Sequence, residues 1–238
     1  MQYDQCLIVF AQTAQARGAV PRLAKEVGTN FCAELYKRFL SDTLATMQGG
    51  PFAVDVFYPP DMGKEAGTLS ANPCRFYPQR GDGAAEKMTN AFTECFGRAF
   101  RSAVWIGADC PDLPREIVET AFGVLADGDE YDAVIGPTAG GGYYLIGFNG
   151  NAFEPDVFYG PSPTDASVLE ETLDFMRNRG VRPKLISRWQ HVTDRTALAK
   201  LIDRNVGTGF DVSQTMTYLK SKKISSGWQI LDPRFALS

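Results

Sequence analysis

Short runs of apolar residues alternate along the chain with longer stretches in which apolar side chains recur every three or four positions. The short runs are rich in β-branched and aromatic residues, which is typical of strands buried on both faces of a parallel sheet. The longer stretches have the spacing of an amphipathic helix. We therefore predict strands at residues 6–11, 52–58, 102–106, 131–135, 143–148 and 184–187, and helices at residues 29–47, 82–96, 114–126, 166–179 and 195–203.

The alternation of strands and helices predicts an α/β fold, a three-layer α/β/α sandwich with a mainly parallel sheet. Residues 12–28 and 61–80 are polar or rich in proline and glycine, so we expect loops there. We find no repeat or linker and predict one domain over residues 1–238. From about residue 205 the chain has little periodicity, so we expect an irregular extension that wraps the domain or mediates homo-oligomer formation.

The composition is that of an ordinary globular protein, with 44% hydrophobic and 22% charged residues. The net charge is −4 and there is no basic run, so neither nucleic acid nor an anionic membrane is an expected partner. The five cysteines are odd in number and include no C-x-x-C pair, which favours reduced thiols in a cytoplasmic protein. No apolar stretch is long enough for a signal peptide or a transmembrane helix.

Ligands of open α/β sheets bind beyond the carboxyl ends of the strands. The loop after the first strand begins at Phe10 and Ala11 and reaches Arg22. Its backbone N–H groups are candidates for holding a nucleotide, and the planar guanidinium of Arg22 suits a diphosphate. From these residues alone, Arg22 is better explained as an ordinary solvated charge. The loop lacks a G-x-G-x-x-G pattern, which disfavours a Rossmann dinucleotide site.

The third strand runs into Gly107, Ala108 and Asp109, and two prolines follow. Asp109 stands at the end of an apolar strand, too early to cap the helix that begins near Pro114. It is therefore a candidate ligand for Mg²⁺ or Mn²⁺, since such ions take few protein carboxylates when a diphosphate supplies other oxygens. Asp112, by contrast, is positioned to cap that helix, and we expect it to do so.

A third segment places three glycines before the fifth strand. Gly141 and Gly142 permit positive φ angles and close approach of a ligand to the backbone. Tyr143 and Tyr144 follow, and either ring could stack on a sugar. Because side chains alternate along a strand, only one of the two can face a site. A plain turn explains the glycines about as well.

These segments together resemble the bacterial radical-SAM/selenodomain-associated transferase family, glycosyltransferase-like proteins with the nucleotide-diphospho-sugar transferase (GT-A) fold. The resemblance runs from about residue 5 to residue 203. It is carried by IGADCPDLP and GPTAGGGYYLIGF, and by LYKRFLSDTL, QRGDGAAEKM and VLEETL in matching order and spacing. It implies a GT-A fold, a nucleotide site that includes Gly107, Ala108 and Lys87, and a sugar or acceptor pocket around the glycine turn.

The chain departs from the family pattern at several positions. Val20 stands in place of a family lysine, and Gly140 in place of an aspartate. His191 also stands in place of an aspartate, and it is the only histidine in the chain. A metal ligand or an acid/base group is a possible role for it, although a lone histidine is more often structural. Asp109 and Arg22 are retained.

The resemblance implies metal-assisted transfer of a sugar from a nucleotide-diphosphate sugar to a small acceptor, with Asp109 holding the ion. Two alternatives stay open at this stage. One is a nucleotidyltransferase of the same fold, which the missing lysine disfavours. The other is a non-catalytic nucleotide-binding homologue, which the lost carboxylates favour. Fold analogy does not separate the three.

Overall fold

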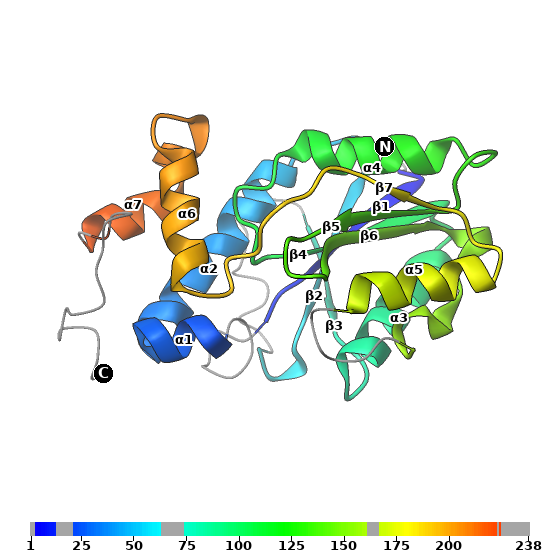
Figure 1. The fold of residues 1–238 in the computed structure, drawn as a ribbon, viewed down its shortest axis with the longest axis horizontal. Helices are drawn as coiled ribbons and strands as arrows, with labels where there is room; N and C mark the ends of the chain where they lie inside the picture. Colours follow the sequence, from blue (N-terminus) through cyan, green and yellow to red (C-terminus); the bar gives the residue numbers. More distant parts are fainter. Residues whose placement is uncertain (1–2, 13–20, 63–73, 161–166, 223, 225–238) are drawn as a thin grey trace.

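The computed structural model describes residues 3–12, 21–62, 74–160, 167–222 and 224. They form a seven-stranded sheet in the order β3-β2-β1-β4-β6-β5-β7 (Figure 1). All neighbouring strands are parallel except β6, which is antiparallel to both β4 and β5. The strands are β1 (Gln5–Phe10), β2 (Ala53–Tyr58), β3 (Arg75–Pro78), β4 (Ser102–Gly107), β5 (Ala133–Pro137), β6 (Tyr143–Asn149) and β7 (Pro183–Leu185).

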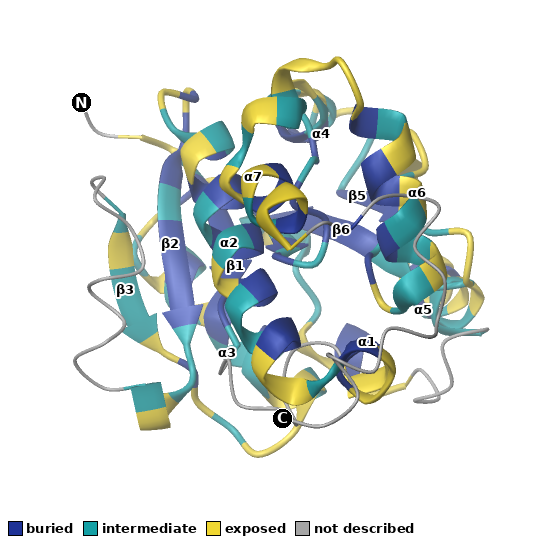
Figure 2. Ribbon diagram, turned by 90° about the vertical axis from the view of Figure 1, so that its left-hand side faces the viewer, coloured by how far each residue is buried: buried dark blue, intermediate teal, exposed yellow. Residues whose placement is uncertain are grey.

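The central strands are buried on both faces, as their continuous apolar runs predict. Residues 6–10 of β1 and every residue of β5 are buried. Figure 2 shows β2 and β6 as buried, whereas β3 at the sheet edge is only partly so. The mainly parallel α/β sheet predicted from the sequence is therefore confirmed.

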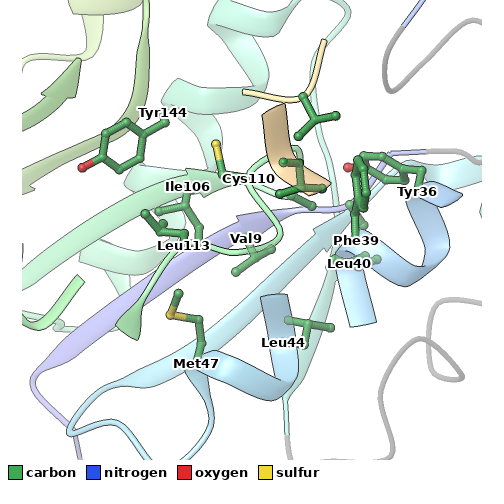
Figure 3. Packing of buried hydrophobic residues seen from close by; sticks show 14 of the residues in the cluster. Val9, Tyr36, Phe39, Leu40, Leu44, Met47, Ile106, Cys110, Leu113 and Tyr144 are labelled. Carbon is green, nitrogen blue, oxygen red and sulfur yellow. The ribbon is translucent and has the colours of Figure 1, made fainter. Parts of the chain in front are cut away.

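Helices cover both faces of the sheet and bury two separate cores against it. One core packs α2 (Thr29–Met47) and α4 (Arg115–Ala126), together with α1 (Pro21–Val27), α6 (Arg195–Asn205) and α7 (Gln214–Ser221). The opposite core packs α3 (Ala84–Gly97) and α5 (Val168–Asn178). Figure 3 shows part of the first core, where Ile106, Cys110 and Leu113 meet residues of α2. This is the three-layer arrangement predicted from the periodicity.

Three elements differ from the sequence prediction. α1 lies in a predicted loop, because Pro21 starts a helix instead of breaking one. β3 lies in the second predicted loop, where Pro78 is tolerated since it ends a short edge strand. α7 lies in the segment predicted to be irregular, and Ser213 caps it by accepting from the N–H of Met216.

The sequence predicts which segments are helical better than it predicts where each helix begins. α2 begins after Gly28, whose φ is 88°, and no side chain caps its start. α4 begins one residue later than predicted, with Pro114 as its N-cap. No helix in the described part of the chain is both long and apolar enough to cross a bilayer.

The antiparallel direction of β6 fixes the place of the site. The carboxyl ends of β1, β4 and β5 lie at one edge of the sheet, and the amino end of β6 joins them there. The turn after β4 and the turn between β5 and β6 therefore meet at the same edge. This is the edge at which open α/β sheets bind their ligands.

Candidate active site

A cleft of about 620 Å³ opens at this edge of the sheet. Its walls come from the end of β4, the turn between β5 and β6, and the segment that leads into α6. The volume is in the usual range for small-molecule sites. Another cavity, of about 520 Å³, lies where β2 begins, at the opposite edge of the sheet. We assign the site to the first cleft because it contains Asp109 and lies at the carboxyl edge.

Asp109 lies in the turn after β4 and lines the cleft, with 22% of its side chain exposed. Its carboxylate folds back over Gly107. A Cβ atom built on Gly107 would lie 2.5 Å from Asp109 Oδ1, far closer than atoms normally approach. Glycine at position 107 therefore leaves free the space that this carboxylate occupies.

His191 reaches Asp109 from the segment between β7 and α6. Its Nδ1 atom lies 3.7 Å from Oδ2 of Asp109. Its Nε2 atom is buried without a hydrogen-bond partner in the described part of the chain. The next residue, Val192, donates its backbone N–H to the carbonyl of Asp109 at 2.8 Å. The two segments are therefore joined at the point where the two side chains meet.

The donor set around Asp109 fits a divalent cation. A carboxylate oxygen of Asp109, the imidazole of His191 and the sulfur of Cys110 lie within 4.8 Å of one another. Cys110 is fully buried, and burial, followed by the charge of Asp109, raises its pKa well above the usual range. Asp109 and His191 line the cleft, whereas Cys110 does not. One carboxylate and one imidazole remain, which leaves room for ligand oxygens.

Tyr143 and Tyr144 point to opposite faces of the sheet, as the alternation of side chains along a strand requires. Tyr143 lines the cleft and packs edge-on against Trp105, with ring centroids 6.5 Å apart. Tyr144 is fully buried on the other face and donates its hydroxyl to the carbonyl of Ser187 at 2.7 Å. The prediction that Tyr144 belongs to the pocket is corrected: its ring is part of the core (Figure 3).

The glycine turn between β5 and β6 adopts a conformation that favours glycine at one of its three glycine positions. Gly141 has a φ of 89°, in the region that favours glycine. The carbonyl of Gly142 accepts the N–H of Thr138 at 2.9 Å, which closes the turn. Gly140 and Gly142 line the cleft. The predicted close approach of backbone to a ligand is thus geometrically available here.

The loop after β1 contributes less than predicted in its described part. Phe10 packs against Trp105 at 5.9 Å, inside the core. The N–H of Ala11 already donates to the carbonyl of Phe57, so it is not available to a nucleotide. Arg22 is 72% exposed and lies 3.4 Å from both Glu26 and Asp194. Residues 13–20 lie outside the described residues.

Two predicted nucleotide-binding residues lie beside the cleft. Ala108 is buried under the turn, so only its backbone could serve a ligand. Lys87 lies one turn into α3, whose first residue, Ala84, lines the cleft. Sequence reasoning did not single out Lys200, an exposed residue of α6 that lines the cleft. The helical spacing of α6 was the available signal for it.

Asp112 does not cap α4, contrary to expectation. No side chain caps that helix. The carboxylate is only 3% exposed and accepts from Arg204 Nε and Nη2 at 2.6 and 2.8 Å. It also accepts from Asn205 Nδ2 at 2.8 Å and Trp189 Nε1 at 3.2 Å. Asp112, which the local sequence predicts to be a helix cap, instead forms an ion pair with the distant Arg204.

Comparison with known proteins was made against families, curated sequences and solved structures. The model of an uncharacterized protein family conserved in bacteria, DUF2064, matches residues 43–162, half of the chain. The chain belongs to this family. A search of curated proteins found no match. None of these comparisons bears on an association with radical-SAM or selenodomain proteins, which stays a prediction.

Solved structures extend the similarity over nearly the whole chain. A protein from Desulfovibrio desulfuricans G20, provisionally named a nucleotide-diphospho-sugar transferase, is 29% identical with a TM-score of 0.86. The match covers 93% of this chain and 96% of that one. Two others share the fold only. A cytidylyltransferase from Leptospira borgpetersenii has a TM-score of 0.59 at 10% identity, covering 97% and 100% of the two chains. A 4-diphosphocytidyl-2C-methyl-D-erythritol synthase from Anaerococcus prevotii has 0.55 at 12%, covering 91% and 96%.

Proposed function

We propose that this DUF2064 protein is a metal-assisted glycosyltransferase that uses a nucleoside diphosphate sugar as donor. The observation that carries the proposal is the position of Asp109, a cleft-facing carboxylate at the carboxyl end of β4 with His191 beside it. The provisional name of the 29% identical neighbour supports the same class of donor. We infer Mg²⁺ or Mn²⁺ as the cofactor.

Asp109 and His191 would hold the ion, and the diphosphate would complete its coordination. An ion held by these two side chains would supply positive charge next to the departing nucleoside diphosphate. Lys200, exposed on the cleft wall, offers a second positive charge to the same phosphates. Arg22 is less available to the phosphates, since it is already paired with two carboxylates.

The opposite wall suits a sugar. Tyr143 and Trp105 present aromatic surface to the cleft, and aromatic rings bury the apolar faces of sugars well. The Thr138 side chain and the turn at Gly142 add polar groups and an open backbone for hydroxyls. The donor would therefore lie with its phosphates toward Asp109 and its sugar toward β6.

The products of the reaction test this assignment. Purified protein would be incubated with UDP-, GDP- and TDP-sugars, or with nucleoside triphosphates and sugar phosphates, each with Mn²⁺ or with a chelator. Release of a nucleoside diphosphate only with metal agrees with glycosyl transfer. Pyrophosphate release from triphosphates would instead show a nucleotidyltransferase. Metal-independent nucleotide binding without either product would show a binding protein.

A further inference from the structure

The segment between β7 and α6 carries much of the cleft wall but has little regular structure of its own. Residues 188–194 form no helix or strand, yet Gln190, His191 and Asp194 line the cleft. Figure 1 shows this stretch of chain crossing from the sheet to α6. A segment of this kind keeps its shape only through the contacts that it makes with the rest of the fold.

Asp112 links this segment to the end of α6. The side-chain donors that reach its carboxylate all come from residues 189–205, on either side of His191. The pair with Arg204 is bidentate, with a fork geometry that fixes orientation as well as distance. Arg204 also reaches back to Gln190, with Nη1 at 3.3 Å from Oε1. The carboxylate thus contacts the start of the segment directly through Trp189, and through Arg204 it joins Gln190 to the end of α6.

Asp109 also contacts this segment. Asp109 and Asp112 belong to the same short turn after β4. That turn holds the segment twice, through the carbonyl of Asp109, which accepts the N–H of Val192, and through the carboxylate of Asp112, which accepts the indole N–H of Trp189. His191, whose Nδ1 lies 3.7 Å from Asp109 Oδ2, lies between these two attachments. A buried carboxylate three residues from the cation site is therefore tied to the geometry of that site.

We propose that Asp112 is a positioning residue that holds His191 against Asp109 and thereby sets the affinity of the cleft for a divalent cation. The cation part of this inference rests on the proposed function. Groups that orient metal ligands without touching the metal typically change metal affinity by about 10- to 100-fold when they are lost. Asp112 does not line the cleft, so its effect on binding would be indirect.

The test compares Asp112→Asn with Asp42→Asn. An asparagine at 112 turns an amide nitrogen toward the guanidinium donors of Arg204 and removes the ion pair. Asp42 is a matched control, because it is also a buried carboxylate and holds another C-terminal element, the start of α7, through the N–H groups of Gln214 and Thr215. Arg204→Gln breaks the same ion pair from its more exposed side, in case Asp112→Asn does not fold.

Two readouts are needed. Mn²⁺ binding, followed by electron paramagnetic resonance, is expected to weaken about tenfold or more in Asp112→Asn and in Arg204→Gln, and to change less than twofold in Asp42→Asn. Amide hydrogen exchange is expected to accelerate at Val192 in the first two variants, and only around α7 in the control. Both readouts are independent of transferase activity.

The outcomes separate the two proposals. If wild-type protein binds no Mn²⁺, the proposed function fails, while faster exchange at Val192 in Asp112→Asn still supports positioning. If wild-type protein binds Mn²⁺ and the three variants match it, or if exchange at Val192 is unchanged, Asp112 is only a structural ion pair and the positioning role is overturned.

Discussion

Replacing Gly107 with alanine separates the geometry of the site from the stability of the fold. The new Cβ would lie 2.5 Å from Asp109 Oδ1, about 0.9 Å short of an ordinary contact at 3.4 Å. The carboxylate must therefore move by about that distance. Gly107 is not among the residues with positive φ, so alanine itself fits the strand. Alanine in a strand is even expected to stabilise by roughly 0.5–1 kcal/mol relative to glycine.

A displacement of about 1 Å in a reacting group can cost roughly 100-fold in rate. We expect Gly107→Ala to lose about that much in kcat/KM and at least tenfold in Mn²⁺ affinity, while its melting temperature changes little. Calorimetry of Mn²⁺ binding and thermal denaturation would be measured on the same samples. Wild-type Mn²⁺ affinity in this variant would refute the steric role of Gly107.

Two other glycines serve as controls for this experiment. A Cβ on Gly123 in α4 meets nothing within 4 Å, so Gly123→Ala is expected to leave both stability and binding intact or to raise stability slightly. A Cβ on Gly147 in β6 would lie 2.7 Å from the Val104 side chain. Gly147→Ala is therefore expected to lower stability with no selective loss of binding.

Three further predictions concern the rest of the molecule. Asp55→Asn removes the fully buried partner of Arg98 and should cost roughly 3 kcal/mol in urea unfolding; a loss below 1 kcal/mol would show that Arg98 finds solvent. Tyr144→Phe deletes one buried hydrogen bond and should cost about 1 kcal/mol without changing ligand binding, since the ring lies in the core. Cys110 is buried, and its burial raises the pKa of its thiol. Iodoacetamide at pH 8, followed by mass spectrometry, should therefore label the half-buried Cys74 first and Cys110 only after the protein unfolds. Early labelling of Cys110 would contradict its burial.

The sheet was predictable because its central strands are continuous apolar runs, a signal that does not depend on distant residues. The predictions of secondary structure failed where the local sequence is compatible with two structures and tertiary packing decides between them. Pro21 breaks a helix or starts one, and only contact with α2 and α6 decides between them. The four-residue β3 is too short for a period to be recognised and is set by pairing with β2.

Asp109 could be singled out from the sequence because a carboxylate directly after a buried strand points to the sheet edge. Its partner could not. His191 lies 82 positions further along the chain, next to residues that are linked to Asp112 through Trp189 and through Arg204, which is 92 positions from Asp112. Local reasoning assigned Asp112 to a helix cap, because a nearby cap is the commoner use of such a residue.

The central claim is that Asp109 anchors a cation on which nucleotide binding depends. Its most direct test is the thermal shift caused by nucleoside diphosphate sugars, with and without Mn²⁺, in wild-type protein and in Asp109→Asn. We expect Mn²⁺ to increase the rise in melting temperature caused by the nucleotide sugar in wild-type protein, and to have no such effect in Asp109→Asn. The variant should keep its fold, because 22% of the Asp109 side chain is exposed. An equal, metal-dependent shift in both proteins would contradict the claim.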